Sequence, residues 1–187
     1  MIRRCALGLV AALLIGAVPA LADDANTLVI DVSGSANGRV EIALLPDVAP
    51  EHVARIKTLA REGAYDGVAF HRVIEGFMAQ TGDVEHGTRA RFSSGRAGTG
   101  GSSYPDLPAE FSAEPFERGT VGMARAQNPN SANSQFFIMF APAPHLNGQY
   151  TVVGRVIGGQ DVVDSIARGS GRGGSVAEPD FMETVRI

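Results

Sequence analysis

One arginine and two glutamines lie within apolar stretches of the sequence, where they could act on a ligand without forming a covalent bond. Arg72 and Gln80 belong to FHRVIEGFMAQTGD (residues 70–83), and Gln135 belongs to SQFFIMF (residues 134–140). Burying an unpaired guanidinium among apolar groups costs several kcal/mol. Arg72 therefore has an internal partner or faces a ligand, and the residues alone leave both interpretations open.

Alternation along a strand places apolar and amide side chains on shared faces. Met78 and Gln80 are two positions apart, as are Gln135 and Phe137, so each pair lies on one side of its expected strand. A face that mixes apolar and amide groups is typical of a pocket lining rather than of a continuous core. The neighbours Phe136 and Phe137 have an alternative interpretation as ordinary core residues.

Other kinds of chemistry find little support in the sequence. We expect no metal site, because the four histidines show no ligand spacing. His71 lies next to Arg72 on the opposite side of a strand, which favours a core histidine over a catalytic base. The GTGGSS segment from Gly98 lacks the lysine of a phosphate-binding loop, and no serine lies in a nucleophile elbow. The histidines are His52, His71, His86 and His145.

The first 22 residues have the pattern of an export signal. Two arginines precede an uncharged apolar run from Ala6 to Val18, and small residues follow at Ala20-Leu21-Ala22, where a signal peptidase would cut. This run is shorter than the roughly 20 apolar residues that a membrane-spanning helix needs. We therefore expect residues 1–22 to be a cleaved signal peptide and residues 23–187 to form the exported domain, with no membrane span.

Composition excludes several kinds of partner and bond for that domain. The chain has 16 basic and 20 acidic residues, and loss of the two leader arginines changes its formal charge from −4 to −6. Such a surface does not favour nucleic acid or anionic lipid. The only cysteine, Cys5, lies in the leader, so the remaining domain has no disulfide. The 165 residues left of 187 fit a single domain with a sizeable core.

Periodicity predicts mostly short strands and two helices. Alternation around Asn37-Gly38 predicts a β-hairpin with a tight turn within residues 27–45. A helical period predicts one helix over residues 49–63, with Val53, Ile56, Leu59 and Ala60 on its apolar side, and a second from Asp161 to Arg168. Further strands are expected at residues 68–74, 77–81, 119–126, 134–140, 150–157 and 181–187, and a Gly/Ser/Arg-rich surface loop at 87–108. This arrangement favours a closed or nearly closed antiparallel sheet.

The ordered segments FHRVIEGFMAQTGD, GTVGMARA, NSQFFIMF and HLNGQYTVVGRVIGGQDVVDSI resemble the cyclophilins, which are peptidyl-prolyl cis-trans isomerases. The resemblance runs from Val29 to Ile187. It implies a mainly β fold, a closed eight-stranded antiparallel β-barrel capped by two α-helices. It also implies a rotamase that needs no cofactor and forms no covalent intermediate. An alternative function remains, that of a proline-directed peptide-binding module or holdase chaperone without turnover.

The resemblance implies roles for particular residues of this chain. Arg72 would be the catalytic arginine, and Gln80 and Gln135 would bind the substrate backbone and orient that arginine. Arg125 stands where the family usually has asparagine, a change that is tolerable if main-chain atoms bind the substrate. The substrate-binding residues would be Phe77, Met78, Gln80, Met123, Ala124, Arg125, Gln135, Phe137, His145 and Leu146.

Two departures from the common family pattern indicate a bacterial, exported member. His145 replaces the tryptophan on which tight cyclosporin binding depends, so we expect weak cyclosporin binding. The loop from Gln127 to Asn133 is one residue longer than in the common eukaryotic form. With the leader, these features predict a periplasmic monomer. Its partners would be proline-containing exported polypeptides that are unfolded or partly folded.

Overall fold

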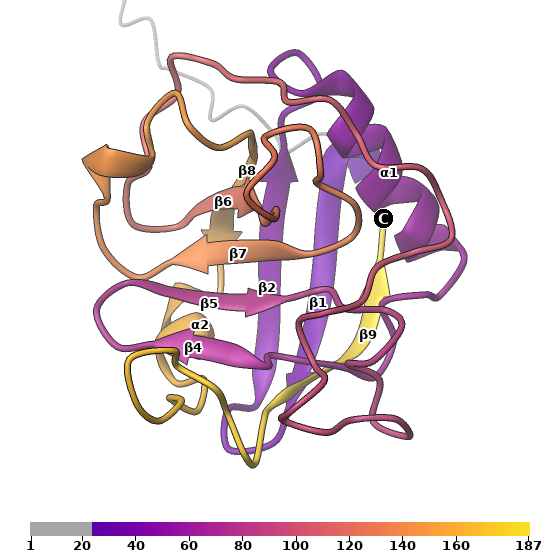
Figure 1. Cartoon of the computed structure of the whole chain (residues 1–187), viewed down its shortest axis with the longest axis vertical. Helices are drawn as coiled ribbons and strands as arrows, with labels where there is room; N and C mark the ends of the chain where they lie inside the picture. Colours follow the sequence, from indigo (N-terminus) through magenta and orange to yellow (C-terminus); the bar gives the residue numbers. More distant parts are fainter. Residues whose placement is uncertain (1–23) are drawn as a thin grey trace, which may run out of the picture.

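Residues 24–187, the part of the chain that the computed structural model describes, are organised around one nine-stranded antiparallel sheet (Figure 1). The residues expected to form a signal peptide, 1–22, lie outside this part. Along the sheet the strands follow the order β3-β9-β1-β2-β8-β6-β7-β5-β4. The strands are β1 (Thr27–Ser33), β2 (Gly38–Leu44), β3 (Val68–Ala69), β4 (Arg72–Ile74), β5 (Met78–Thr81), β6 (Thr120–Met123), β7 (Phe136–Met139), β8 (Val152–Gly158) and β9 (Phe181–Arg186).

The β1–β2 hairpin confirms the expected pairing but not the expected tight turn. Val32 pairs with Gly38, so the connection is a longer loop and not a two-residue turn at Asn37-Gly38. Ala36 is buried within this loop, and its N–H donates to Asp180 Oδ1 at 2.9 Å. The prediction of a tight turn was wrong because this distant aspartate holds a longer loop against the body of the sheet.

The strand expected at residues 68–74 is divided into two. β3 pairs with β9 at one edge of the sheet, and β4 pairs with β5 at the other edge. The chain crosses between them at Phe70-His71, where the Phe70 N–H donates to the Asp180 carbonyl at 2.9 Å. The sheet therefore has nine strands, not eight, and its edges are joined by the chain instead of by a strand ladder. The mainly antiparallel β class with two helices is as expected.

Two α-helices pack beside the sheet, together with the short 3-10 helices η1 (Asp24–Asn26) and η2 (Pro144–Leu146). Helix α1 (Pro50–Arg61) buries the predicted apolar side and contacts β9. Helix α2 (Gln160–Asp164) is shorter than predicted. Beyond it, the Ala167 N–H donates to Asp180 Oδ2 at 2.7 Å, so the chain turns toward this buried aspartate and does not continue as a helix.

Apolar side chains form two buried clusters. The larger one fills the interior of the curled sheet, with Ile30, Ile42 and Ile138 fully buried. The smaller one lies beside β7 and consists of Met78, Phe116, Phe137, Met139, Ala143, Leu146 and Val152. Several of its members belong to the predicted site, so this cluster provides a rigid support for it.

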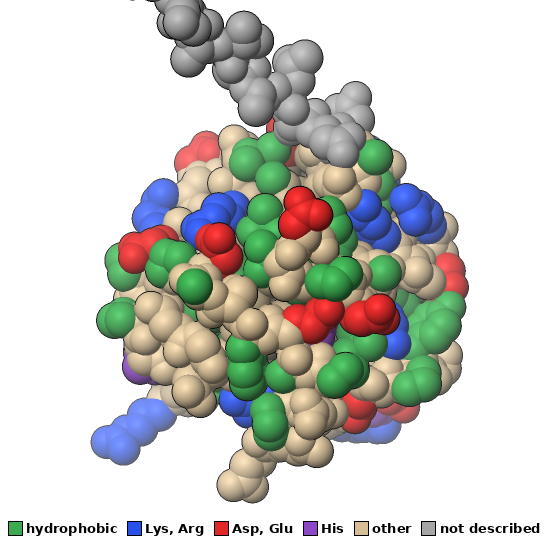
Figure 2. All heavy atoms as spheres, turned by 90° about the horizontal axis from the view of Figure 1, so that it is seen from above, with side chains coloured by type: hydrophobic (Ala, Val, Ile, Leu, Met, Phe, Trp, Pro, Cys, Tyr) green, Lys and Arg blue, Asp and Glu red, His purple; other side chains and the backbone are tan. Residues whose placement is uncertain are grey.

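The long Gly/Ser/Arg-rich loop is irregular but is held in place. Residues 87–108 contain no strand or helix, as expected, and are tied down by isolated bridges of Thr88 to Val68 and Leu107 to Ala132. On the face shown in Figure 2, acidic, basic and apolar side chains are interspersed. Within residues 24–187, every helix falls short of the length and apolar character needed to cross a membrane.

Candidate active site

Three neighbouring strands place the main polar and aromatic groups of the predicted site in one row. Arg72 on β4 lies directly opposite Gln80 on β5, and Gln80 lies directly opposite Phe137 on β7. Residues that face each other across antiparallel strands project to the same side of the sheet. The ladder register therefore brings together a guanidinium, an amide and a ring that are distant in sequence.

Uncharged oxygens hold the Arg72 guanidinium. Nη1 donates to Gln80 Oε1 at 3.0 Å, and Nε donates to the Gly173 carbonyl at 3.0 Å. Arg72 forms no ion pair with any other residue of the stretch 24–187. Burial lowers the pKa of Arg72, but an arginine remains protonated in a protein. The structure thus combines the two interpretations of Arg72, because internal oxygen partners hold the guanidinium and the residue also lines a pocket.

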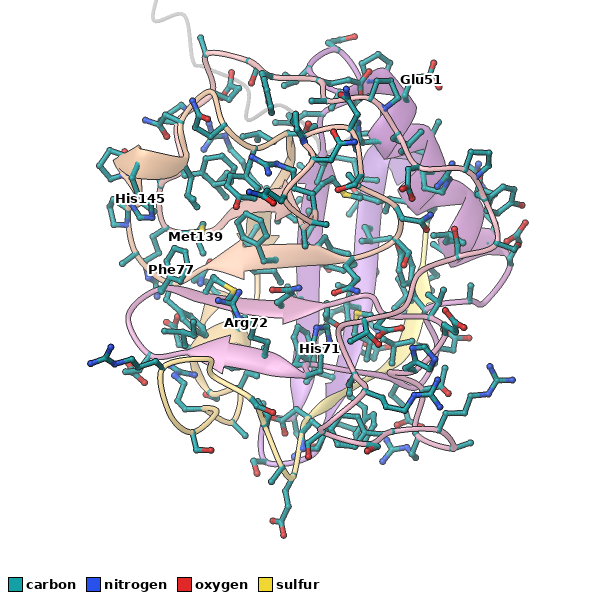
Figure 3. The ribbon with its side chains drawn as sticks, in the orientation of Figure 1. Glu51, His71, Arg72, Phe77, Met139 and His145 are labelled. Carbon is teal, nitrogen blue, oxygen red and sulfur yellow. The ribbon has the colours of Figure 1, made fainter. Side chains whose placement is uncertain are left out.

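The pocket beside Arg72 has a volume of about 150 Å³, and most of its lining residues are apolar or aromatic. Figure 3 shows Arg72 together with Phe77, which lies in the turn between β4 and β5. Aliphatic and aromatic side chains face one cation and one amide, so the pocket suits a small apolar ring beside a polar backbone group. Its lining residues are Arg72, Phe77, Met78, Gln80, Ala124, Arg125, Phe137, Leu146 and Tyr150.

The other predicted site residues lie next to this pocket or behind it. Gln135 lines an adjoining pocket of about 390 Å³, and its Oε1 accepts a hydrogen bond from Gln80 Nε2 at 2.9 Å. The exposed His145 ring stacks on Phe77, with ring centroids 5.8 Å apart (Figure 3). Met123 is buried in the larger core cluster, so its side chain points away from the pocket.

Arg125 holds its side chain against Tyr150 and leaves its main chain available. The guanidinium lies over the Tyr150 ring at 4.4 Å and donates to the Gln149 carbonyl at 2.8 Å. Across residues 24–187, its main-chain N–H and C=O make no hydrogen bond. An unpaired donor and acceptor at a pocket rim can bind an extended peptide.

Two aromatic residues of the site have no role in the sequence-based prediction. Tyr150 lines the pocket and meets Phe137 edge-on, with ring centroids 5.9 Å apart. Phe116 stacks behind Phe137 at 5.7 Å and is fully buried. Tyr150 is the first residue of the strand expected at residues 150–157, which was only a weak indication that it belongs to the site. Phe116 lies in an irregular segment without periodicity, so no sequence signal indicated it.

The groups that line this pocket can act on a ligand through hydrogen bonds and apolar contacts. Within the described residues, no group of three His, Cys, Asp or Glu side chains is arranged to hold a metal ion. A fixed cation, an amide and apolar walls can bind and polarise a ligand through hydrogen bonds. The arrangement therefore fits a reaction in which rotation about a bond, and not bond cleavage, is accelerated.

Comparisons with known proteins agree with this geometry. The family model "Cyclophilin type peptidyl-prolyl cis-trans isomerase/CLD" matches residues 28–187. The "Probable peptidyl-prolyl cis-trans isomerase" of Brucella suis biovar 1 (strain 1330) is 63% identical over 173 residues, which cover 90% of this chain and 87% of the relative. "Peptidyl-prolyl cis-trans isomerase B" of Bacillus subtilis (strain 168) is 39% identical over 151 residues, covering 80% and 90%.

Solved structures show the same fold. A Cryptosporidium parvum cyclophilin-type isomerase, solved in the presence of the dipeptide Ala-Pro, superposes with a TM-score of 0.72 at 25% identity, covering 86% of this chain and 98% of that one. The cyclophilin AquaCyp293 from Hirschia baltica gives a TM-score of 0.70 at 26% identity, covering 86% and 73%. The chain thus belongs to the cyclophilins, the cofactor-independent peptidyl-prolyl cis-trans isomerases whose motifs its sequence resembles.

Proposed function

We propose that the pocket beside Arg72 holds the ring of a substrate proline and that Arg72 is the catalytic residue. An X-Pro imide resists rotation because resonance gives its C–N bond partial double-bond character, with a barrier of about 18–20 kcal/mol. Twisting the bond localises the lone pair on the proline nitrogen, which can then accept a hydrogen bond. A guanidinium beside that nitrogen stabilises the twisted state more than either planar isomer.

The single observation that carries this proposal is the way Arg72 is held. Its partners are the uncharged oxygens of Gln80 and Gly173, so its positive charge is oriented but not neutralised. Each additional preference of about 1.36 kcal/mol for the twisted state raises the rate tenfold. Binding the planar isomers as strongly as the twisted state would leave the rate of rotation unchanged. A cation already in place also avoids reorganisation during the reaction.

The remaining groups would hold the proline ring and the flanking chain while the carbonyl side of the bond rotates. Phe77, Met78, Phe137 and Leu146 would grip the proline ring, while Gln80 and the free main chain of Arg125 would bind the flanking chain. With one side fixed, rotation of the other becomes the reaction. Met123 would contribute main-chain atoms only, because its side chain is buried in the core.

We further propose a role in the folding of exported proteins. The signal-peptide pattern of residues 1–22 supports export to the periplasm, where polypeptides arrive unfolded. Uncatalysed X-Pro isomerisation takes tens to hundreds of seconds and can limit folding. Proline-containing unfolded or partly folded exported chains are therefore the proposed substrates, and the protein would act as a monomer. N-terminal sequencing of the exported form should begin at Asp23, and a chain still carrying residues 1–22 would contradict this role.

A proline-switch assay on a short peptide tests the catalytic proposal. The wild type should accelerate cis/trans exchange. Arg72→Ala should lower this activity about 10²-fold or more, which is the scale of removing one preorganised transition-state donor. Equal rates for both proteins would refute the role of Arg72. Peptide binding without turnover by the wild type would instead favour a proline-directed binding module or holdase.

A further inference from the structure

Asp83 is a fully buried acid for which the proposed reaction has no direct use. It follows β5, and both of its carboxylate oxygens accept main-chain hydrogen bonds. Oδ1 accepts the N–H groups of Glu85 at 3.1 Å and His86 at 2.8 Å. Oδ2 accepts those of Gly98 at 2.7 Å and Gly100 at 3.0 Å. One carboxylate thereby ties the end of β5 to a segment of the long Gly/Ser-rich loop.

The same loop segment determines how the Gln135 side chain is oriented. Gln135 Nε2 donates to the carbonyls of Gly98 at 3.1 Å and Gly100 at 2.8 Å. Only the NH₂ group of an amide can donate, so these two carbonyls turn the Gln135 oxygen toward Gln80. That oxygen accepts from Gln80 Nε2 at 2.9 Å. The Gln80 oxygen must then point the other way, toward Arg72 Nη1 at 3.0 Å.

Close packing keeps the loop segment in this place. A Cβ atom on Gly100 would lie 2.5 Å from Asp83 Oδ1, and a Cβ on Gly98 would lie 3.0 Å from the buried His71 ring. Gly98 also has a φ of +96°, which side-chain-bearing residues rarely adopt. The two glycines therefore allow the backbone to approach the carboxylate closely enough for its N–H groups to bind it.

We propose that Asp83 is a positioning residue for the isomerisation. Through residues 98–100 and the two glutamine amides, it presents an oxygen acceptor to Arg72 and so holds the guanidinium against the proline pocket. This inference rests on the proposed catalytic role of Arg72. Asp83 touches no substrate, and its effect passes entirely through hydrogen bonds whose direction is dictated at each step.

The substitution Asp83→Asn interrupts this chain at its first member. An asparagine has one acceptor oxygen, and its NH₂ group would face main-chain N–H groups that it cannot satisfy. The loop segment must move, and the amides of Gln135 and Gln80 then lose their enforced orientation. The guanidinium of Arg72 samples more positions while the apolar pocket wall stays intact. A loss in kcat without a matching change in KM is the expected consequence.

Asp180 provides a matched control. It is also buried, and its two carboxylate oxygens likewise accept main-chain N–H groups, from Ala36 and Ala167. None of these contacts belongs to the chain of hydrogen bonds that leads to Arg72. Asp180→Asn should therefore lower the stability of the protein but leave the kcat of the folded fraction unchanged. Urea unfolding supplies the folded fraction of each variant.

NMR exchange spectroscopy on a short Ala-Pro peptide gives kcat and KM separately for the full chain without its leader. Asp83→Asn should lower kcat about tenfold with KM within about twofold, a loss intermediate between no effect and removal of the donor itself. The double variant Asp83→Asn with Gln135→Ala should lose no more kcat than the worse single variant, because both substitutions interrupt the same series of hydrogen bonds. A kcat loss no larger than that of Asp180→Asn, or additive losses in the double variant, would overturn the proposal.

The ¹⁵N signal of Arg72 Nη1, the atom that donates to Gln80, separates this inference from the proposed function. Asp83→Asn should shift or broaden that signal, and Asp180→Asn should leave it in place. An unchanged signal in Asp83→Asn overturns the positioning role even if Arg72 is catalytic. Equal activity of wild type and Arg72→Ala would instead refute the catalytic role, while the signal would still report whether Asp83 positions the guanidinium. If Asp83→Asn does not fold, Asp83→Ser, which keeps a smaller acceptor, undergoes the same comparison.

Discussion

Arg72 and Gln80 face each other across the β4–β5 ladder, and the guanidinium Nη1 lies 3.0 Å from the amide Oε1. The partner of the cation is thus an oxygen without formal charge. A carboxylate at this position would hold the guanidinium equally well but would also neutralise it. The chemical identity of residue 80 therefore decides how much positive charge a bound imide nitrogen meets.

Gln80→Glu should lower kcat/KM by about tenfold or more, because a charged partner competes with the substrate nitrogen for the guanidinium. Gln80→Leu is the matched control, since it removes the hydrogen bond without adding charge. The proline-switch assay on both variants separates the two effects. If Gln80→Glu were as active as the wild type, or no worse than Gln80→Leu, the importance of an unneutralised cation would be refuted.

The polar row of the site was predictable from the sequence because strand parity is a local property. Met78 and Gln80 were placed on one face, and both line the pocket. The same alternation places Met123 and Ala124 on opposite faces of the expected strand, and only Ala124 lines the pocket. The family motif alone implies both residues, so alternation carries information that the motif does not.

Three wrong predictions about the fold depend on one remote residue, Asp180. Asp180 bonds the loop after β1 and the chain after α2 through its side chain, and the crossing at Phe70 through its main chain. These bonds replaced the tight turn, ended the second helix early and divided the 68–74 strand. No local pattern at those three places indicates a partner so far along the chain. Tertiary contacts overrode local propensity at each of them.

Gly122→Ala should weaken substrate binding through the pocket wall. Gly122 on β6 lies opposite Phe137, and an added Cβ would come within 2.6 Å of the Phe116 ring and 2.7 Å of the Phe137 ring. Both rings must shift, which costs about 1–3 kcal/mol of stability and moves one wall of the pocket. We expect KM for a proline peptide to rise several-fold, as measured by NMR exchange.

Gly95→Ala is the control for this substitution, because a Cβ there meets no atom within 4 Å. It should leave both stability and KM near the wild-type values. Unfolding in urea measures the first, and the same exchange experiment measures the second. A Gly122→Ala protein that bound peptide as tightly as Gly95→Ala would contradict the dependence of the pocket on the stacked rings.

His145→Trp should strengthen cyclosporin binding with little effect on peptide turnover. The imidazole is exposed and stacks on Phe77 outside the pocket lining, so a larger indole can extend over the same ring. Inhibition of the proline-switch reaction should require at least about tenfold less cyclosporin, the factor given by about 1.4 kcal/mol of added contact. Unchanged inhibition would show that residue 145 does not limit cyclosporin binding here.

Acid should destabilise the protein through Glu110, which joins the long loop to the start of α1. The Glu110 carboxylate accepts hydrogen bonds from the Glu51 and His52 N–H groups at 3.1 Å each, and its Oε2 lies 2.6 Å from His52 Nδ1. Burial raises the pKa of Glu110, but these hydrogen bonds outweigh burial and leave the pKa below its ordinary value of 4.5. The folded state thus binds the proton less tightly than the unfolded state does.

The sign of the pH dependence follows from that lowered pKa. The stabilisation by Glu110 is fully present above pH 4.5 and is lost as the pH falls through the lower pKa of the folded state. Glu110→Gln should therefore cost about 1.5–3 kcal/mol at pH 7, the scale of a hydrogen bond to a charged group, and progressively less below pH 4.5. Urea unfolding from pH 7 to pH 3 measures this convergence. The exposed Glu178 offers the control Glu178→Gln, and a wild-type advantage over Glu110→Gln that persisted at pH 3 would refute the assignment.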